Sequence, residues 1–414
     1  LKEAGHRGAR SRPPFPLVAD SPPAAMVRLL LGIFRDLYVV LLIILAIEQI
    51  PGNDLLHDMT RKGVIAVTVC IVVAKLVQPL VGNSPGGPVR APRRQKKTEG
   101  GKSALLEWAS SEMQGWRPAM EDATRVVLGL GPPLEAFAMF GVFDGHGGDS
   151  VSRRAADELP AQLLACASGL PQDAAAGSCG LAEHALKEAL PALDSSLRED
   201  GAGIPGFLPG AACGPIPSDV VNAYGLTGST AVIALVECEG GPGGGRPLRA
   251  VVANLGDSRA LLCRGGEAVP LTEDQKPDVP LERERIERAG GFVAAVGPCQ
   301  RIDGWGLNLS RALGDFHYKA RDDLPPAEQK VSCVPEVLTC ELTEHDEFLL
   351  LCCDGVFELK TNQEAVDHVR RGLLSGQQLT EVVEDLVDSC CSPNLFQTQG
   401  HGSDNVSAMV VLLR

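Results

Sequence analysis

The residues with the clearest potential for chemistry are aspartates at the ends of apolar segments. Asp144 follows FGVF, Asp354 follows LLLCC, Asp257 follows ANLG, and Asp404 precedes NVSAMVV. A single aspartate beside a strand is usually a turn residue. Several carboxylates at one sheet edge, however, repel one another and need cations between them. Clustered carboxylates with water suit magnesium or manganese. The sequence therefore presents either separate turns or a site for hard divalent cations.

Two further side chains stand out by their type and their position near these carboxylates. Arg117 lies in GWRPAMEDA, four residues before the adjacent pair Glu121 and Asp122. A planar guanidinium can bind two phosphate oxygens at once, although a surface arginine can also pair with an acidic body. His146 stands among glycines just after Asp144. It could transfer a proton in a reaction at such a site, although most histidines have structural roles.

The elements that must position these residues begin near residue 104, where short β-type segments alternate with amphipathic helical ones. Strands are predicted over 136–144, 229–238, 248–258, 259–266, 347–355 and 405–414. Helices are predicted over 151–166, 181–197, 281–289, 363–374 and 379–387. Residues 249–263 are interpreted as a hairpin, so the sheet should be largely antiparallel. This mixture of elements predicts α+β layers.

Charge and cysteine content narrow the function classes. The 414 residues hold 38 Lys and Arg against 52 Asp and Glu, a net charge of -14. Residues 1–100 carry +7 and the remainder -21, so the body of the chain is a poor nucleic-acid binder and favours cations or a basic partner. The 13 cysteines show no zinc-type spacing. They predict a reducing compartment, with the catalytic domain in the cytosol.

The first hundred residues form a predicted N-terminal extension with apolar segments and a basic Gly/Pro-rich linker over 82–101. Residues 29–81 could associate with a membrane, next to a basic flank. A cleaved signal peptide, buried helices and a mistranslated leader are the competing interpretations. Gly/Pro-rich stretches near 168–225 and 239–247 are predicted to be surface insertions.

Eight motifs in order carry a resemblance to a known family. They are GWRPAMEDA, FGVFDGHGG, TGSTAVIAL, ANLGDSRA, LTEDQKPD, LNLSRALGD, EFLLLCCDGVFE and GSDNVSAMVV. The set resembles that of the PP2C-type metal-dependent protein serine/threonine phosphatases and spans about 104–414. It implies a phosphatase domain over 101–414, folded as a four-layer α-β-β-α sandwich with two mainly antiparallel central sheets. LNLSRALGDFHYK followed by LPPAEQKVSCVPEV is similar to the gamma-type branch of the family.

The resemblance also implies a mechanism. Phosphoserine and phosphothreonine in proteins would be hydrolysed by a hydroxide that bridges two Mn²⁺ or Mg²⁺ ions, without a phosphoenzyme. Asp144 would bridge both ions, with the Gly145 carbonyl and Glu121 on one and Asp354 and Asp404 on the other. All four acidic ligands are present, which argues against a catalytically inactive binding module.

Supporting roles follow from the same resemblance. Arg117 would bind the phosphoryl group and His146 would be the general acid. Asp122, Asp257 and Glu358 would hold either a third metal ion or the waters around the metals.

A salt bridge between Arg311 and Asp315 is expected to fix a segment that borders the site. Thr230 and Asn405 are expected to support strand ends. Thr124 stands where the family frequently has histidine.

Overall fold

The structure is a computed structural model that describes residues 91–169, 177–201, 225–238 and 249–413. These residues belong to one compact unit, Ala91–Arg414. The extension up to residue 90, and with it the predicted membrane-associated segment 29–81, lies outside the described residues. Among the described helices, none combines the length and the apolar character that crossing a membrane requires.

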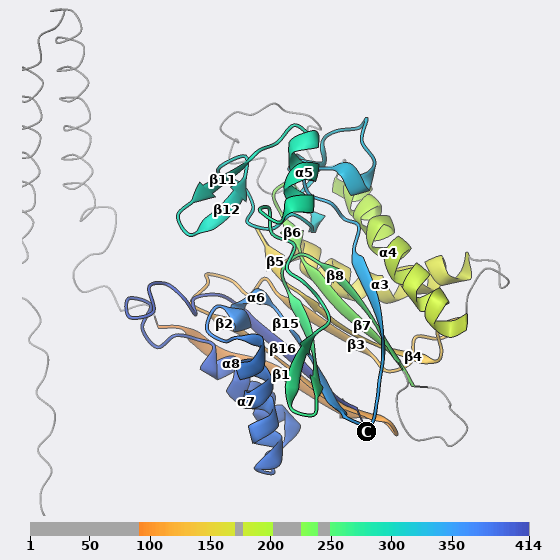
Figure 1. Cartoon of the computed structure of the whole chain (residues 1–414), viewed down its shortest axis with the longest axis vertical. Coiled ribbons are helices and arrows are strands. Elements are labelled where there is room, and N and C mark those ends of the chain that lie inside the picture. The colour runs from red at the N-terminus through yellow and green to blue at the C-terminus, as the bar shows by residue number, and fades with distance from the viewer. Residues whose placement is uncertain (1–90, 170–176, 202–224, 239–248, 414) are drawn as a thin grey trace, which may run out of the picture. The chain divides into compact units, whose positions relative to one another are not determined.

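Two antiparallel sheets form the centre of the unit (Figure 1). The larger sheet, in spatial order, consists of Arg93–Lys102 (β1), Leu106–Gly115 (β2), Val406–Leu413 (β16), Asp346–Cys352 (β15), Arg259–Arg264 (β9) and Glu267–Pro270 (β10). The smaller sheet consists of Glu336–Glu341 (β14), Arg249–Leu255 (β8), Ala231–Glu237 (β7), Phe137–Phe143 (β4) and Ala123–Val127 (β3). Short strands at one end are Gly145–His146 (β5), Gly228–Ser229 (β6), Leu313–Gly314 (β13), Val293–Val296 (β11) and Cys299–Ile302 (β12).

Helices cover the outer face of each sheet. Ser150–Ser168 (α3) and Gly177–Gly201 (α4) pack on the smaller sheet, and Asn362–Leu374 (α7) and Leu379–Ser389 (α8) pack on the larger one. The remaining helical segments are Pro280–Arg288 (α5), Asp354–Phe357 (α6), Phe316–Lys319 (η1) and Pro326–Glu328 (η2). In Figure 1, α5 lies with β11 and β12 near β5 and β6.

The alternation of side chains along β4 explains the layering. Phe140 and Val142 pack between the two sheets, whereas Met139 and Phe143 pack against the helices α3 and α4. Successive residues of a strand point to opposite faces, so a strand with no polar side chain can be buried on both faces. The result is an α-β-β-α sandwich, and the predicted fold class is confirmed.

The predicted hairpin over 249–263 is wrong. β8 belongs to the smaller sheet and β9 to the larger one, so the chain crosses between the sheets at residues 256–258. Gly256 has φ of +112°, a conformation that an L-residue rarely adopts, and it allows the sharp change of direction. The true hairpin partner of β9 is β10. The crossing leaves Asp257 at the junction of the two sheets.

Two predicted boundaries need correction. Residues 93–101 of the predicted linker form most of β1, because an edge strand with an exposed face can be polar and still pair with β2. Residues 177–201, within the predicted insertion 168–225, form α4; this confirms the helix predicted over 181–197, but α4 contributes Leu186 and Leu190 to the core and is not a surface insertion. The rest of the predicted insertions, residues 170–176, 202–224 and 239–247, lies outside the described residues.

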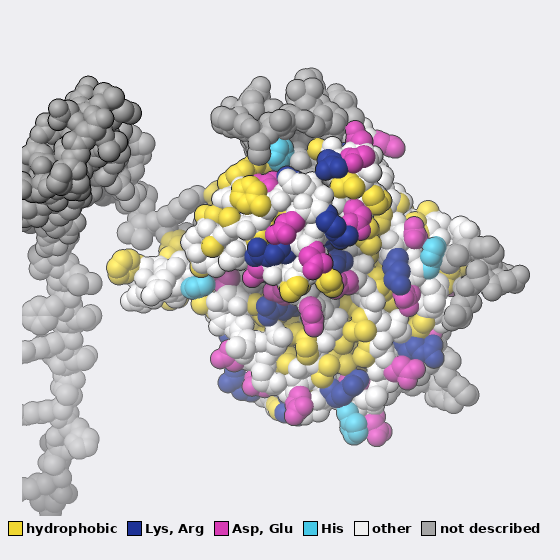
Figure 2. Space-filling view, turned by 45° about the horizontal axis from the view of Figure 1, so that its top comes forward, with side chains coloured by type: hydrophobic (Ala, Val, Ile, Leu, Met, Phe, Trp, Pro, Cys, Tyr) yellow, Lys and Arg dark blue, Asp and Glu magenta, His cyan; other side chains and the backbone are white. Residues whose placement is uncertain are grey.

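One face of the described unit is mixed in charge. On the face shown in Figure 2, Lys and Arg side chains lie interspersed with Asp, Glu and hydrophobic side chains. This mixed pattern contrasts with the continuous basic surface that nucleic-acid binding uses.

Candidate active site

Two strands from different sheets deliver the central aspartates. Asp144 directly follows β4, and Asp354 begins α6, separated from the end of β15 by Cys353. Thr230, between β6 and β7, fixes the backbone of the first: Thr230 N donates to Asp144 O at 2.9 Å, and Asp144 N donates to Thr230 Oγ1 at 3.2 Å. The two carboxylates lie close enough for their charges to interact.

Two glycines let other parts of the chain approach these aspartates. A Cβ added to Gly145 would lie 2.2 Å from the carbonyl oxygen of Glu121, so only glycine fits there. A Cβ added to Gly355 would lie 3.4 Å from Cβ of Asp404 and 2.2 Å from the next backbone oxygen. The glycine after each aspartate therefore brings a second predicted metal ligand beside it.

The Asn405 side chain ties the same segments together. Its Oδ1 accepts from Glu121 N at 2.9 Å, and its Nδ2 donates to Gln114 O at 2.8 Å and to Ala119 O at 3.0 Å. The backbone N–H of Asn405 also donates to Asp404 Oδ1 at 2.7 Å, so the side chain and the backbone of this one residue help to position two predicted ligands, Glu121 and Asp404.

Burial and mutual repulsion disfavour the charged form of these carboxyl groups. Burial raises the pKa of Asp144 well above its ordinary value, and the charges of Asp122, Asp354, Asp257 and Asp404 raise it further. Burial, followed by Asp257 and Asp404, likewise raises the pKa of Asp354. Burial raises the pKa of Asp122 to about 7, and Asp122 Oδ1 is buried without a hydrogen-bond partner among the described residues.

Two cationic side chains serve as counterions. Arg117 Nη2 lies 2.6 Å from Asp404 Oδ2, and Lys276 Nζ contacts Asp257 Oδ2. No three His, Cys, Asp or Glu side chains of the described residues are already arranged to ligate one ion. The donor set nevertheless fits hard divalent cations in its chemistry, since it combines mutually repelling carboxylates with a buried oxygen that lacks a partner.

His146 is held by a buried aspartate. His146 Nε2 lies 2.7 Å from Oδ2 of Asp315, a residue with no solvent exposure. Burial lowers the pKa of His146, but the charge and hydrogen bond of Asp315, with smaller contributions from Asp257 and Glu121, outweigh burial and raise the pKa. This environment favours the protonated ring that a general acid requires.

The expected pair of Arg311 and Asp315 is wrong. Arg311 Nη2 instead contacts Glu282 Oε1 at 2.6 Å and Glu336 Oε1 at 2.8 Å. Side chains four residues apart are neighbours on a helix. The intervening segment holds strand β13, however, and extended residues at that spacing are separated by about 13 Å.

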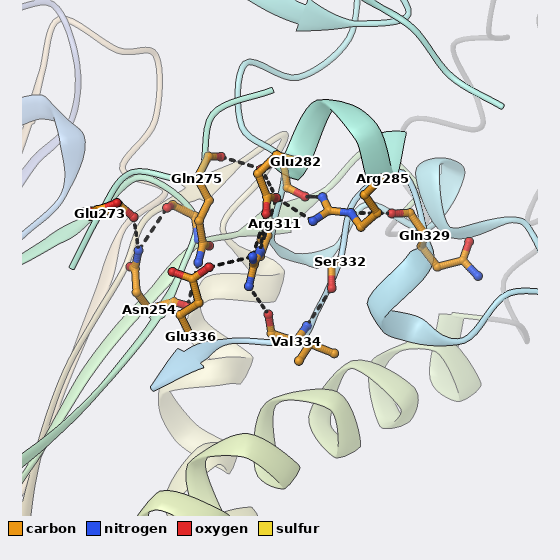
Figure 3. A network of polar contacts seen from close by, with 12 residues as sticks. Asn254, Glu273, Gln275, Glu282, Arg285, Arg311, Gln329, Ser332, Val334 and Glu336 are labelled. Carbon is orange, nitrogen blue, oxygen red and sulfur yellow. Dashed lines mark hydrogen bonds and ion pairs between the residues drawn. The ribbon is translucent and has the colours of Figure 1, made fainter. Parts of the chain in front are cut away.

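A buried polar network fixes the segment that carries Asp315 (Figure 3). Glu282, on α5, accepts from Arg285 Nη1 at 2.6 Å, from Arg311 Nη2 at 2.6 Å and from Ser310 Oγ at 2.5 Å. Ser310 N also donates to Gln275 O at 2.9 Å. Gln275 in turn exchanges hydrogen bonds with the Gly256 backbone, next to Asp257. The network thus joins α5 to both sides of the candidate site.

The other predicted residues have identifiable contacts. Glu358 Oε2 accepts from Gly402 N at 2.6 Å and from Ser403 N at 3.3 Å, which holds the loop before Asp404. Thr124 Oγ1 donates to Glu112 Oε1 at 2.6 Å.

Lys276 is a site residue that the sequence analysis did not single out. Burial lowers its pKa, but Asp257 and then Asp354 outweigh burial and raise it. The only signal was its place in the LTEDQKPD motif, 19 residues after Asp257.

The two sheets bring carboxylates to a common end, beside an arginine and a histidine. This arrangement suits a metal-dependent hydrolase. The comparisons agree: residues 106–396 match the model of the family Protein phosphatase 2C. Similar proteins include Protein phosphatase 2C homolog 2 of Hypocrea jecorina (strain QM6a), 35% identical over 79% of this chain and 66% of that protein. Probable protein phosphatase 2C 60 of Arabidopsis thaliana is 34% identical over 77% of this chain and 90% of its own.

A solved structure shows the same fold. The serine-threonine phosphatase 2C from Toxoplasma gondii superposes with a TM-score of 0.59 at 22% identity and covers 77% of this chain and 99% of its own. The chain belongs to the protein phosphatase 2C family and is an enzyme of the protein-phosphatase class. The similarity to the gamma-type branch stays a prediction.

Proposed function

We propose that this protein hydrolyses phosphoserine and phosphothreonine in protein substrates with two Mn²⁺ or Mg²⁺ ions. The observation that carries the proposal is the convergence of buried carboxylates at the junction of two sheets, where Asp144 follows β4 and Asp354 begins α6 after β15; burial and the neighbouring carboxylates raise the pKa of both. A cluster of buried carboxylates destabilises the fold, so proteins seldom keep one without a function. Divalent cations would relieve the repulsion between the carboxylates.

The ions would be held by Asp144, the Gly145 carbonyl and Glu121 on one side, and by Asp144, Asp354 and Asp404 on the other. Bound ions of this kind supply an activated water and neutralise charge on the phosphoryl oxygens. Asp122 would orient water near the metals through its partnerless Oδ1.

A third ion, or the waters around the two ions, would engage Asp257 and Glu358. The two differ in surroundings, because Asp257 pairs with Lys276 whereas Glu358 already accepts two backbone hydrogen bonds. Asp257 is therefore the better candidate for a direct ligand.

Two side chains would act on the substrate. Arg117 is half exposed and directs only one N–H to a carboxylate among the described residues, so the rest of its guanidinium can bind phosphoryl oxygens. His146, held by Asp315, would donate its proton to the departing serine or threonine oxygen. Serine and threonine alkoxides are poor leaving groups, so this proton transfer matters for the rate.

The test is release of phosphate from a phosphothreonine peptide with and without Mn²⁺. We expect activity that a chelator removes and that Asp144→Asn abolishes. Asp367→Asn, on the exposed face of α7, makes the same chemical change away from the site and should retain activity. Chelator-resistant turnover, or equal activity in the two variants, would contradict the proposal.

We further propose a cytosolic catalytic domain that can associate with membranes through residues 29–81. Six of the described cysteines are buried free thiols, which suits a reducing compartment. Fractionation of the full chain beside residues 91–414 tests the membrane proposal. Equal solubility of the two proteins would remove it.

A further inference from the structure

A groove of about 1100 Å³ lies along one flank of the sandwich. Its walls come from β1 and β3, which are the edge strands of the two sheets, together with β2 and α3. Met120 and Asp122 also line the groove, and these two residues flank Glu121, the predicted metal ligand. The groove therefore extends to the two residues next to Glu121 in the sequence, at the border of the candidate active site.

The lining of this groove is basic although the unit around it is acidic. Its charged side chains are Arg93, Arg94, Lys96, Lys97, Arg125 and Arg153 against Glu99, Glu112, Asp122 and Asp157. Residues 91–414 hold 28 Lys and Arg and 46 Asp and Glu, a net charge of -18. Arg94 and Lys96 pair with Asp388 of α8 at 3.4 Å and 2.6 Å, so Arg93, Arg125 and Arg153 are the side chains that can attract an anionic ligand to the groove.

Three arginines of the groove keep most of their hydrogen-bonding capacity. Arg93 donates to a glutamine oxygen at 3.3 Å, Arg125 to Asp157 at 3.3 Å, and Arg153 contacts the aspartate one turn earlier at 2.8 Å. A guanidinium has five N–H donors, and no further acceptor serves these three side chains within the described residues. Apart from the buried Nε of Arg125, the remaining N–H groups of these planar side chains can bind carboxylates in pairs.

The acidic side chains of the wall are already engaged. Glu112 accepts from Thr124 Oγ1 at 2.6 Å and lies 3.7 Å from Lys97 Nζ, which also contacts Glu99 at 3.3 Å. The Asp157 side chain is 74% exposed and points its charge to solvent as well as to Arg125. Glu99 and Glu112 therefore do little to cancel the attraction of the three arginines, and Arg125 alone shares its charge with an acid of the described wall, Asp157.

We propose that this groove binds an extended, carboxylate-rich segment of a protein substrate, an inference that rests on the proposed phosphatase function. The groove is far larger than one phosphate group needs. It also runs between two sheet edges, whose outward backbone groups can pair with an extended chain. A substrate with its phosphorylated residue at the metal site would place a neighbouring acidic segment along β1 and β3.

Binding is tested first without turnover, by fluorescence anisotropy of a fluorescein-labelled oligoglutamate peptide on the full chain. We expect binding that weakens with salt and that is about tenfold weaker or more in Arg93→Glu/Arg125→Glu. Arg370→Glu/Arg371→Glu, on α7, is the matched control with the same change of charge. Equal binding by the two double variants would overturn the proposal, as would a groove that takes inorganic phosphate but not the peptide.

Kinetics then connect the groove to substrate choice. For a phosphothreonine peptide with an acidic extension, the groove variant should raise KM about tenfold and leave kcat unchanged. Its turnover of p-nitrophenyl phosphate should equal that of the unaltered protein. An unchanged KM for the acidic peptide would refute the proposal. Failure of the proposed function would look different, since neither substrate would then release phosphate while peptide binding could persist.

Discussion

Replacing Glu282 by alanine should destabilise the protein strongly. Glu282 is 3% exposed and is the shared acceptor of Arg285, Arg311 and Ser310. Its removal leaves a buried guanidinium, that of Arg285, without its carboxylate. Breaking a buried ion pair from one side costs about 3–5 kcal/mol. With a urea dependence of about 2 kcal/mol per M, the unfolding midpoint should fall by about 1.5–2.5 M.

Urea denaturation followed by circular dichroism measures this shift. Glu284→Ala, on the exposed face of the same helix, is the matched control and should shift the midpoint little. Burial raises the pKa of Glu282, but Arg311 and Arg285 outweigh burial and lower it. The charge therefore stabilises the fold above the ordinary carboxyl pKa, and its contribution disappears as pH falls through the lowered pKa. A Glu282→Ala shift no larger than that of Glu284→Ala would refute this account of the network.

Three further predictions concern the site. His146→Ala should lower kcat for a phosphothreonine peptide by about 10²–10³ and lower it much less for p-nitrophenyl phosphate, whose leaving group needs no proton; equal losses would remove His146 from the acid role. Gly145→Ala should lose manganese-dependent activity and keep its circular dichroism spectrum, because the new Cβ would displace Glu121; normal activity would show that the close approach is dispensable. Because the pKa of Asp122 is raised to about 7 and that of Asp144 is raised as well, the metal-free fold loses stability as pH rises from about 4 to about 7. Asp144→Asn should therefore raise the thermal midpoint in chelator at pH 8, and a lower midpoint would contradict the electrostatic argument.

Local patterns were sufficient to predict much of the framework. The apolar runs that end in Asp144 and Asp354 predicted two buried strands with a carboxylate at the end of each. The helix at 363–374 was predictable because its apolar residues recur every three to four positions and form one face. Thr361 and Glu364 also form a capping box at its start. These features depend on neighbours within a few residues, so one sequence contains the necessary information.

Features that depend on distant segments were not predictable in this way. The partner of His146 is 169 residues away, and the local spacing instead favoured the wrong pair of Arg311 and Asp315. The strand β1 has no apolar pattern, because it lies at a sheet edge and owes its conformation to pairing with β2. The crossing at Gly256 was mistaken for a hairpin, since a short link between two strands looks the same whether it turns within one sheet or passes to another.

The central claim is that buried carboxylates from both sheets bind divalent ions for phosphate hydrolysis. Isothermal titration of Mn²⁺ into the metal-free full chain, with Asp354→Asn titrated in parallel, tests it most directly. We predict two ions bound per chain in the unaltered protein, and loss of at least one ion in the variant together with loss of phosphate release. Unchanged manganese binding in Asp354→Asn, or full activity in the protein that binds no manganese, would contradict the claim.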